Sequence, residues 1–486
     1  MPRSVSRFAL VLLLVATAAA GALPRPVARA FLDAGVPLDA VAVVIQDVGS
    51  RRAVVAHRAN VAMAPASVMK LVTTYAALDL LGRDYRWQTR AYTDGPVVGG
   101  VLQGNLVLVG SGDPKITIEQ WQVLMTALRA RGIDRISGDL VLDSRAFDVP
   151  PHDRATFDGA PLRPYNVGPD ALLVNFNSVR FTFTPYEGGA AAAVSVEPPL
   201  PAIRVRSAPA LRDAPCDDWR GALLATFDDH GDTAEVSFPG GFPASCGERS
   251  WYVALLEGGP YVHAMFTTYF RAAGGGFEGR WRRGQVPAGA VLVATLESPP
   301  LYDIVRDVNK LSNNVMARQI FLTLALPRGG PEPQTPPATL AGANAAVQRW
   351  LAARRIDMPG LVLENGSGLS RRERATAGGL VRLLLSADRS AVREEFSSSL
   401  AVAATDGTVE RRFQNARVAG QAFLKTGTLE GVRALAGYVL DPEGRRFAVA
   451  VLVNGPAAAR AQPALDAVVQ WTYRDGAAWA HVIPPR

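Results

Sequence analysis

Ser67 and Lys70 are the residues whose types and spacing first suggest covalent chemistry. They lie in the stretch Ala-Ser-Val-Met-Lys at positions 66–70, and no other serine in the chain has a lysine three residues after it. The 51 basic residues are 47 arginines and four lysines, and of the two types only lysine can give up its proton in a protein. A lysine here therefore predicts a base that removes the serine proton, made neutral by burial or by nearby cations.

A mostly buried helix is expected to position this pair. Apolar residues recur at helical spacing from Ala66 to about Leu81, and Gly82 ends the run. Ser67 then lies in the first turn, with Lys70 one turn later on the same side. The free N–H groups at the start of a helix also suit a nucleophile that becomes linked to an oxyanion.

Two more short motifs follow in order along the chain. Ser312-Asn-Asn314 lies in a helical pattern that starts after Pro300, and Lys425-Thr-Gly-Thr428 lies on or beside a strand. Each motif alone fits an ordinary helix cap, a polar helix face or a strand end. Together and in this order, they indicate a serine acyl-transfer site.

The catalytic roles can be divided among five of these residues. Because no histidine stands in a triad-like context, Lys70 is the candidate base for Ser67. Lys425 supplies a positive charge that also favours a neutral Lys70. Ser312 can relay protons between Lys70 and a leaving group, and Asn314 can hold Lys70 and a substrate amide by hydrogen bonds.

The order of sequence patterns indicates one domain with a long insertion. Residues 40–57 and 422–454 are typical of strands and turns, and helical patterns occupy 301–326, 339–356, 374–387, 391–402 and 458–475. We expect an α+β fold in which residues 23–90 and 291–486 form a five-stranded antiparallel sheet covered by helices. Residues 91–290, with short β-like segments and one helical segment, are expected to form a β-rich inserted region of two subdomains.

Residues 1–22 have the order of a secretory signal peptide. Arg3 and Arg7 precede a short apolar run that grades into small residues, which favours cleavage after Ala22 over a membrane anchor. No later segment offers about 18 uninterrupted apolar residues. The mature chain is therefore expected to be periplasmic, without an integral membrane segment, and soluble or loosely membrane-associated.

Composition and cysteine content limit the cofactors and partners. An oxidising compartment favours a Cys216–Cys246 disulfide, with two separate buried thiols as the alternative. The chain has no CxxC, HExxH or histidine cluster, so no metal or other cofactor is expected. The net charge is +7, but the basic residues are scattered, and nucleic acid is not an expected partner.

The ordered motifs S-x-x-K, S-x-N and K-T-G resemble the signature of penicillin-recognising serine acyl-transferases. With the long insertion, Gly-Ser-Gly-Asp-Pro at 110–114, Asp-Ser-Arg-Ala-Phe-Asp at 143–148 and Asn-Gly-Ser-Gly-Leu-Ser-Arg at 365–371, the chain is similar to the D-alanyl-D-alanine carboxypeptidase/endopeptidases. These are the low-molecular-mass class C penicillin-binding proteins of the penicillin-binding protein 4 type. The resemblance covers nearly the whole mature chain and implies a penicillin-binding/β-lactamase-like fold, peptidoglycan stem peptides as substrates and β-lactam antibiotics as inhibitors. Asn365 stands where the family usually has Asp.

The third motif is expected to bind the terminal carboxylate of the substrate. Thr426 and Thr428 offer hydroxyl groups, and Gly427 lets the strand backbone come close to the carboxylate. The resemblance implies that the backbone N–H groups of Ser67 and Thr428 form the oxyanion hole, where one donor typically contributes roughly 3 to 4 kcal/mol.

The resemblance also implies a pocket for the side chain of meso-diaminopimelate, which carries an ammonium and a carboxylate. It lies between the loop at 365–371 and the inserted region. Arg371 would pair with the carboxylate, Asp143 would take the ammonium, and Phe147 would be an apolar wall.

Three functions are compatible with these residues. The leading one is a serine D-alanyl-D-alanine carboxypeptidase, with D-alanyl-meso-diaminopimelate endopeptidase activity, that trims stem peptides through an acyl-enzyme on Ser67. A β-lactamase or esterase on the same fold is the second, although the large insertion favours a polymer substrate. A non-catalytic wall-binding scaffold is the third, and the intact Ser67, Lys70 and Lys425 argue against it.

Overall fold

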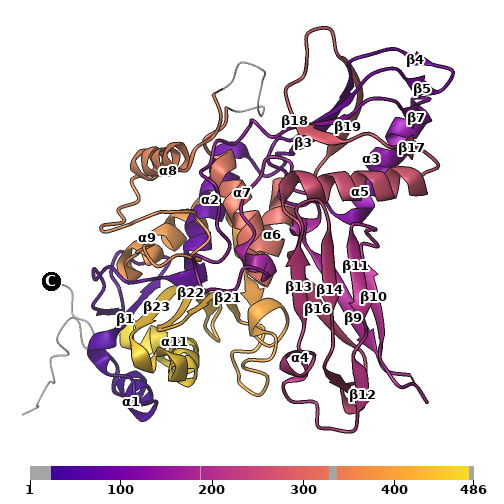
Figure 1. Cartoon of the computed structure of the whole chain (residues 1–486). Coiled ribbons are helices and arrows are strands. Elements are labelled where there is room, and N and C mark those ends of the chain that lie inside the picture. The colour runs from indigo at the N-terminus through magenta and orange to yellow at the C-terminus, as the bar shows by residue number, and fades with distance from the viewer. Residues whose placement is uncertain (1–22, 187, 328–335, 481–486) are drawn as a thin grey trace, which may run out of the picture.

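The computed structural model describes residues 23–186, 188–327 and 336–480 (Figure 1). The signal peptide expected at 1–22 lies outside these ranges, as does most of the proline-rich stretch 327–338 between two of the expected helices.

A six-stranded antiparallel sheet is built from the two end portions of the described chain. Its strand order is β2-β1-β23-β22-β21-β20. The strands are β1 Val41–Asp47, β2 Val55–His57, β20 Ala401–Val402, β21 Ala422–Leu429, β22 Val432–Leu440 and β23 Arg446–Asn454. The five predicted strands and the α+β class are confirmed. The short edge strand β20 occupies part of the stretch 391–402 that the sequence predicts as a helix, where only α10 (Arg393–Ser398) is helical.

Alternate residues of the central strands face two different helical layers, as the two-residue period of a strand requires. In β1, Ala42 and Val44 pack into the core of the first layer, whereas Val43 and Ile45 pack into that of the second. Figure 1 shows the layers on opposite sides of the sheet. The first contains α2 (Lys70–Leu81), α6 (Leu301–Leu311), α7 (Asn314–Thr323), α8 (Leu340–Arg354), α9 (Ala377–Asp388) and α10; the second contains α1 (Arg25–Asp33) and α11 (Gln462–Ala480).

The helix predicted from Ala66 to Leu81 is confirmed. Residues Ala66–Met69 form a 3₁₀ turn that leads directly into α2, and Gly82, with φ of 90°, ends the helix. Every residue from Lys70 to Leu78 is buried, because α2 runs through the first layer between α6, α7 and α8. The opening turn rests against β21 and β22, so the turn that carries Ser67 is fixed against the sheet.

The second motif lies at a break between two helices, whereas the apolar pattern predicts one continuous helix. Ser312 has a left-handed backbone (φ 59°) that ends α6. Asn313 then caps α7 by accepting a hydrogen bond from the backbone N–H of Met316 at 3.0 Å. The apolar period continues across the break because both helices pack on the same core, which hides the break in the sequence.

Residues 88–297 form a β-rich part with its own hydrophobic core. Its strands β3 (Gln88–Thr93) and β19 (Val291–Glu297) pair where the chain enters and leaves it, and the core includes Trp121, Phe181 and Phe266. Its other strands are β4 Val97–Val98, β5 Val101–Leu102, β6 Leu106–Val109, β7 Arg135–Ile136, β8 Leu140–Asp143, β9 Val179–Thr184, β10 Ala193–Glu197, β11 Ile203–Ser207, β12 Ala210–Arg212, β13 Thr226–Asp229, β14 Ala234–Ser237, β15 Gly241–Pro243, β16 Arg249–Val253, β17 Gly276–Phe277 and β18 Trp281–Arg283.

This β-rich part contains one long helix that the sequence pattern does not reveal. The one helical segment expected within residues 91–290 is α3 (Ile118–Ala130), and the structure adds the short α4 (Trp219–Ala222) and the long α5 (Gly258–Ala272). The Gly-Gly-Pro start of α5 conceals it, because glycine and proline are poor helix formers that are tolerated in a first turn.

A disulfide joins Cys216 and Cys246, as the sequence predicts, with Cα atoms 4.9 Å apart. Cys246 is buried in the core of the β-rich part, and Cys216 packs against that core. The bond therefore ties a surface loop to the packed interior.

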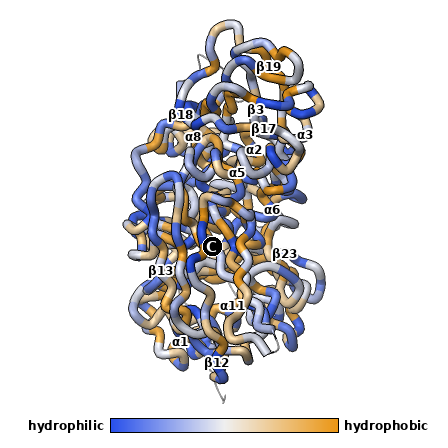
Figure 2. Tube along the Cα trace, turned by 45° about the vertical axis from the view of Figure 1, so that its right-hand side comes forward, coloured by the Kyte–Doolittle hydropathy of each residue, from blue (hydrophilic) through white to orange (hydrophobic). Residues whose placement is uncertain are grey.

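Apolar and hydrophilic residues are interspersed along the trace (Figure 2). Within the described ranges, no helix is both long enough and apolar enough to cross a membrane.

Candidate active site

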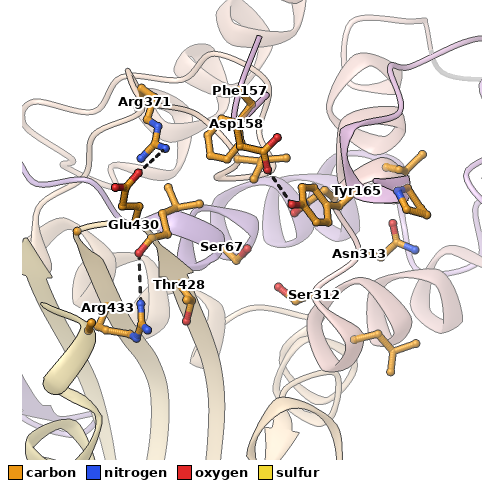
Figure 3. Close-up of a pocket in the computed structure, with 18 of the residues that line it drawn as sticks. Ser67, Phe157, Asp158, Tyr165, Ser312, Asn313, Arg371, Thr428, Glu430 and Arg433 are labelled. Atoms are coloured by element: carbon orange, nitrogen blue, oxygen red, sulfur yellow. Dashed lines mark hydrogen bonds and ion pairs between the residues drawn. The ribbon is translucent and has the colours of Figure 1, made fainter. Parts of the chain in front are cut away.

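The three motifs meet at one cavity. It has a volume of about 1450 Å³ and lies between the opening turn of α2, the α6–α7 junction, β21 and the β-rich part. Ser67, Ser312, Asn314 and Thr428 all line it, and Figure 3 shows Ser67, Ser312 and Thr428 close to one another at its base. Residues separated by more than 200 positions in the sequence are thus brought onto one wall.

The amine of Lys70 is fully buried beneath this wall, with 0% of the side chain exposed. Its Nζ lies 2.9 Å from Ser67 Oγ, 2.6 Å from Asn314 Oδ1 and 2.5 Å from the carbonyl oxygen of Ser367. The last two oxygens can only accept hydrogen bonds. A neutral Lys70 therefore donates its two N–H groups to Asn314 and Ser367 and directs its lone pair at the hydroxyl of Ser67, which is the geometry of a general base.

The surroundings of Lys70 favour this neutral form. Burial, followed by the positive charge of Lys425, lowers the pKa of Lys70 well below its ordinary value. Lys425 is also fully buried, and burial lowers its pKa to about 7. Burial and the neighbouring charge of Lys425 therefore both favour the neutral form of Lys70 that a general base requires.

Ser312 makes its direct contact with Lys425 rather than with Lys70. Lys425 Nζ donates to Ser312 Oγ at 2.9 Å and to the carbonyl oxygen of Thr426 at 3.0 Å. The left-handed backbone of Ser312 ends α6 at the cavity. The hydroxyl therefore stands between a buried cation and the space that a substrate would occupy.

Gly427 lies where β21 meets the turn that carries Ser67. A Cβ atom on Gly427 would lie 2.7 Å from the carbonyl oxygen of Pro65, so a side chain would push the two elements apart. The sequence prediction assigns the need for glycine to substrate approach; the structure assigns it to contact between β21 and this turn.

The two threonines of the third motif differ in position. Thr428 is exposed and lines the cavity. Thr426 donates from Oγ1 to Thr408 Oγ1 at 2.7 Å and is not among the residues that line the cavity. Of the two hydroxyl groups expected to bind substrate, only that of Thr428 faces the cavity.

Arg371 lies on the wall of the cavity opposite Ser312 (Figure 3). Its guanidinium is 4.8 Å from the ring centre of Phe157 and 3.4 Å from the carboxylate of Glu430. Next to Phe157, Asp158 accepts a hydrogen bond from the hydroxyl of Tyr165 at 2.7 Å. Phe157, Asp158, Tyr165 and Glu430 all line the cavity, and sequence reasoning misses them because they lie in loops without a recognisable spacing.

Asp143 and Phe147 do not join Arg371 at this cavity, in contrast to the arrangement that the family resemblance implies. Asp143 ends β8, is 4% exposed and accepts from the guanidinium of Arg145 at 2.9 and 3.0 Å. Phe147 packs over Gly112, where its ring leaves no room for a Cβ atom. Neither residue is among those that line this cavity, whereas Asp158 and Phe157 are.

Asn365 stabilises the loop that contacts Lys70. Its Oδ1 accepts from the backbone N–H and the hydroxyl of Ser367 at 2.9 and 2.7 Å, and its Nδ2 donates to the carbonyl oxygen of Leu369 at 3.0 Å. An amide makes both kinds of bond, so Asn in place of the family's usual Asp keeps this turn closed.

The fold and the site together define the class of the protein. Ser67 is hydrogen-bonded to the buried Lys70 and lies in the turn from which α2 begins, beside an antiparallel sheet. The strand of that sheet that carries Lys-Thr-Gly forms an adjoining wall of the cavity. This is a serine hydrolase of the penicillin-binding-protein fold.

Comparison with known proteins identifies the family. The model of the D-Ala-D-Ala carboxypeptidase 3 (S13) family matches residues 24–475, and the chain therefore belongs to this family.

Relatives match over most of their length. The chain is 29% identical over 426 residues to the D-alanyl-D-alanine carboxypeptidase of Actinomadura sp. (strain R39), a match that covers 85% of this chain and 77% of the relative. It is 24% identical to the D-alanyl-D-alanine carboxypeptidase DacB of Haemophilus influenzae, covering 85% of each. The crystal structure of penicillin binding protein 4 (dacB) from Haemophilus influenzae superposes with a TM-score of 0.73 at 22% identity, over 94% of this chain and 99% of the other. This superposition confirms the predicted fold.

Proposed function

We propose that the protein is a serine D-alanyl-D-alanine carboxypeptidase that removes the terminal D-Ala of peptidoglycan stem peptides, and that it also cuts their D-alanyl-meso-diaminopimelate cross-links. The single observation that carries this proposal is the 2.9 Å contact between Ser67 Oγ and the buried Nζ of Lys70. The family membership of the chain supports the substrate class.

Acylation begins when Ser67 Oγ attacks the carbonyl carbon of the penultimate D-Ala and its proton passes to Lys70. The C–N bond then breaks, and the leaving amine takes a proton supplied through Ser312, whose hydroxyl accepts from Lys425. Water then attacks the resulting ester and gives up a proton that passes through Ser312 back to Lys425. Ser67 Oγ leaves as the ester bond breaks and takes back the proton held by Lys70.

The remaining contacts of the substrate come from the third motif and the opening turn of α2. The charge of Lys425 and the hydroxyl of Thr428 receive the terminal carboxylate. Ser67 and Thr428 both line the cavity, and their backbone N–H groups stabilise the developing oxyanion.

Arg371 and Asp158 form the subsite for the zwitterionic end of the diaminopimelate side chain. Arg371 would exchange its 3.4 Å contact with Glu430 for the substrate carboxylate, Asp158 would receive the ammonium, and the ring of Phe157 would cover the methylene groups. Peptides with meso-diaminopimelate should then be cleaved faster than peptides with L-lysine. Arg371→Ala should remove most of this difference, whereas Arg372→Ala, which changes an arginine of the same loop that pairs with Glu364, should retain it.

Labelling with a fluorescent penicillin tests the proposal. The wild type should form a long-lived adduct that mass spectrometry places on Ser67, and folded Ser67→Ala should show neither the adduct nor D-Ala release. Rapid loss of the label would support a β-lactamase instead, and the absence of both label and D-Ala release would support a non-catalytic scaffold.

Export to the periplasm is part of the same proposal. It is supported by the composition of residues 1–22 and by the Cys216–Cys246 disulfide. N-terminal sequencing of the exported protein should give a chain that begins after Ala22.

A further inference from the structure

Glu373 is a fully buried carboxylate that the mechanism above does not use. Its Oε1 accepts three backbone N–H groups, from Glu364 at 3.1 Å, Asn365 at 2.9 Å and Gly366 at 2.8 Å. Its Oε2 accepts the N–H of Gly368 at 2.9 Å. Burial raises the pKa of Glu373, and the four backbone N–H groups oppose this shift. Because all four of these contacts come from donors, the site accommodates the ionised form of the carboxyl group.

One peptide group connects this carboxylate to the catalytic base. The N–H of Gly368 points at Glu373 Oε2, and the C=O of Ser367, which belongs to the same peptide group, accepts from Lys70 Nζ at 2.5 Å. A hydrogen bond at one end of a peptide group polarises it and strengthens the bond at the other end. Glu373 and Lys70 are thus linked by a chain of two hydrogen bonds.

The peptide group has little freedom to move. A Cβ atom on Gly368, which has φ of 82°, would lie 2.0 Å from the carbonyl oxygen of Ala66. The adjoining carbonyl of Gly366 accepts from Thr73 Oγ1 of α2 at 2.6 Å. The loop is therefore pressed against the helix that carries Lys70, and the carboxylate holds it from the other side.

Three charged groups act on Lys70 from the elements packed around it. Lys425 on β21 and Arg318 on α7 are cations that disfavour its protonated form, and Glu373 on the loop is the anion that favours it. The pKa of Lys70 is lowered by burial and by both cations and is raised by Glu373. Glu364 of the same loop bonds instead to Ser370 and Arg372.

We propose that Glu373 is a positioning residue for Lys70: through the Ser367–Gly368 peptide it holds the carbonyl acceptor on the amine, and its charge offsets those of Lys425 and Arg318. The inference rests on the proposed function, because it assigns Lys70 the role of base. Its consequence is that Glu373 sets the pH at which acylation of Ser67 begins.

The pH dependence of β-lactam acylation tests this. Glu373→Gln keeps an oxygen for the three donors but places an amide nitrogen, which cannot accept, against Gly368. Without the negative charge, Lys70 loses its proton more easily, so the rise of the second-order acylation rate with pH should move to lower pH by about one unit. Glu364→Gln, the matched control on the same loop, should leave the midpoint unchanged. A Glu373→Gln enzyme that is slower at every pH with an unmoved midpoint would overturn the proposal, because that is the result of a merely structural role.

A measurement on the wild type covers the case in which Glu373→Gln does not fold. The chain contains three Ser–Gly pairs, ending at Gly112, Gly138 and Gly368. Labelling serine with carbonyl ¹³C and glycine with ¹⁵N therefore isolates three amide signals. The Gly368 signal should titrate with the acylation midpoint while the other two do not; a Gly368 signal that stays constant through that range would refute the link. A wild type that is never acylated would instead refute the proposed function, and the amide titration would still report on Lys70.

Discussion

Substitution of Gly368 by alanine tests how tightly the loop at 364–368 packs against the turn that carries Ser67. The expected loss of stability has two parts, one from backbone strain and one from steric overlap. Alanine at φ of 82° costs roughly 1 to 2 kcal/mol, because an L side chain is disfavoured in this conformation. The new Cβ would also lie 2.0 Å from the Ala66 carbonyl oxygen and 2.7 Å from the backbone nitrogen of Ser67. Both are backbone atoms that cannot rotate away, so the overpacking adds roughly 1 to 3 kcal/mol to the loss of folding stability.

The displaced atoms belong to Ala66 and to Ser67, the proposed nucleophile. A shift of about 1 Å at a catalytic group can cost on the order of 100-fold in rate, and Gly368→Ala should therefore slow acylation by fluorescent penicillin by about that factor. Gly444→Ala is the matched control, because Gly444 has φ of 80° and no atom lies within 4 Å of the position that its Cβ would take. Gly444→Ala should lose only roughly 1 to 2 kcal/mol of folding stability, from the strained backbone, and its acylation rate should equal that of the wild type.

Urea melts and acylation rates of the two variants check this reasoning. Gly368→Ala should be the less stable of the two as well as the slower. Equal losses of stability, together with a wild-type acylation rate for Gly368→Ala, would show that the loop yields without moving Ser67 and would refute the argument.

Three further outcomes are expected. Lys70→Arg keeps the charge but cannot act as a neutral base, so acylation should fall by roughly 100-fold or more; a near-normal rate in a stopped-flow assay would show that only charge is required. Lys425 has a folded pKa of about 7, below its unfolded value of about 10.4, so between these values only the unfolded state binds the proton and the wild type gains stability as pH rises. The stability of Lys425→Met relative to wild type should thus be highest below about pH 7 and decline toward pH 10 in urea melts; a difference independent of pH would contradict this sign. Replacing both Cys216 and Cys246, which are 30 residues apart, by alanine should cost roughly 3 kcal/mol, and reduced wild type should show the same loss.

The sequence predicts the elements of the central sheet well because their signals are local. Apolar runs separated by turn residues, such as those on either side of Asp441–Arg445, specify strands without reference to the rest of the chain. The break at Ser312 is not predicted, because the apolar period reports which face is buried and is the same for one helix or for two that share a core. The long helix α5 is missed because its first three residues are poor helix formers, and its packing against α3 compensates for them.

The ordered motifs around Ser67, Ser312 and Lys425 predict the family fold and the candidate catalytic groups, since acyl transfer by a serine needs those residue types at short, fixed spacings. The side chains that surround these groups follow from the tertiary fold and not from local spacing. That fold placed Phe157 and Asp158 at the cavity, turned Asp143 toward Arg145, and buried Glu373 behind the loop that touches Lys70. The physical reason is that the orientation of a loop side chain depends on the backbone donors and packed surfaces that reach it from distant segments, and no local spacing records them.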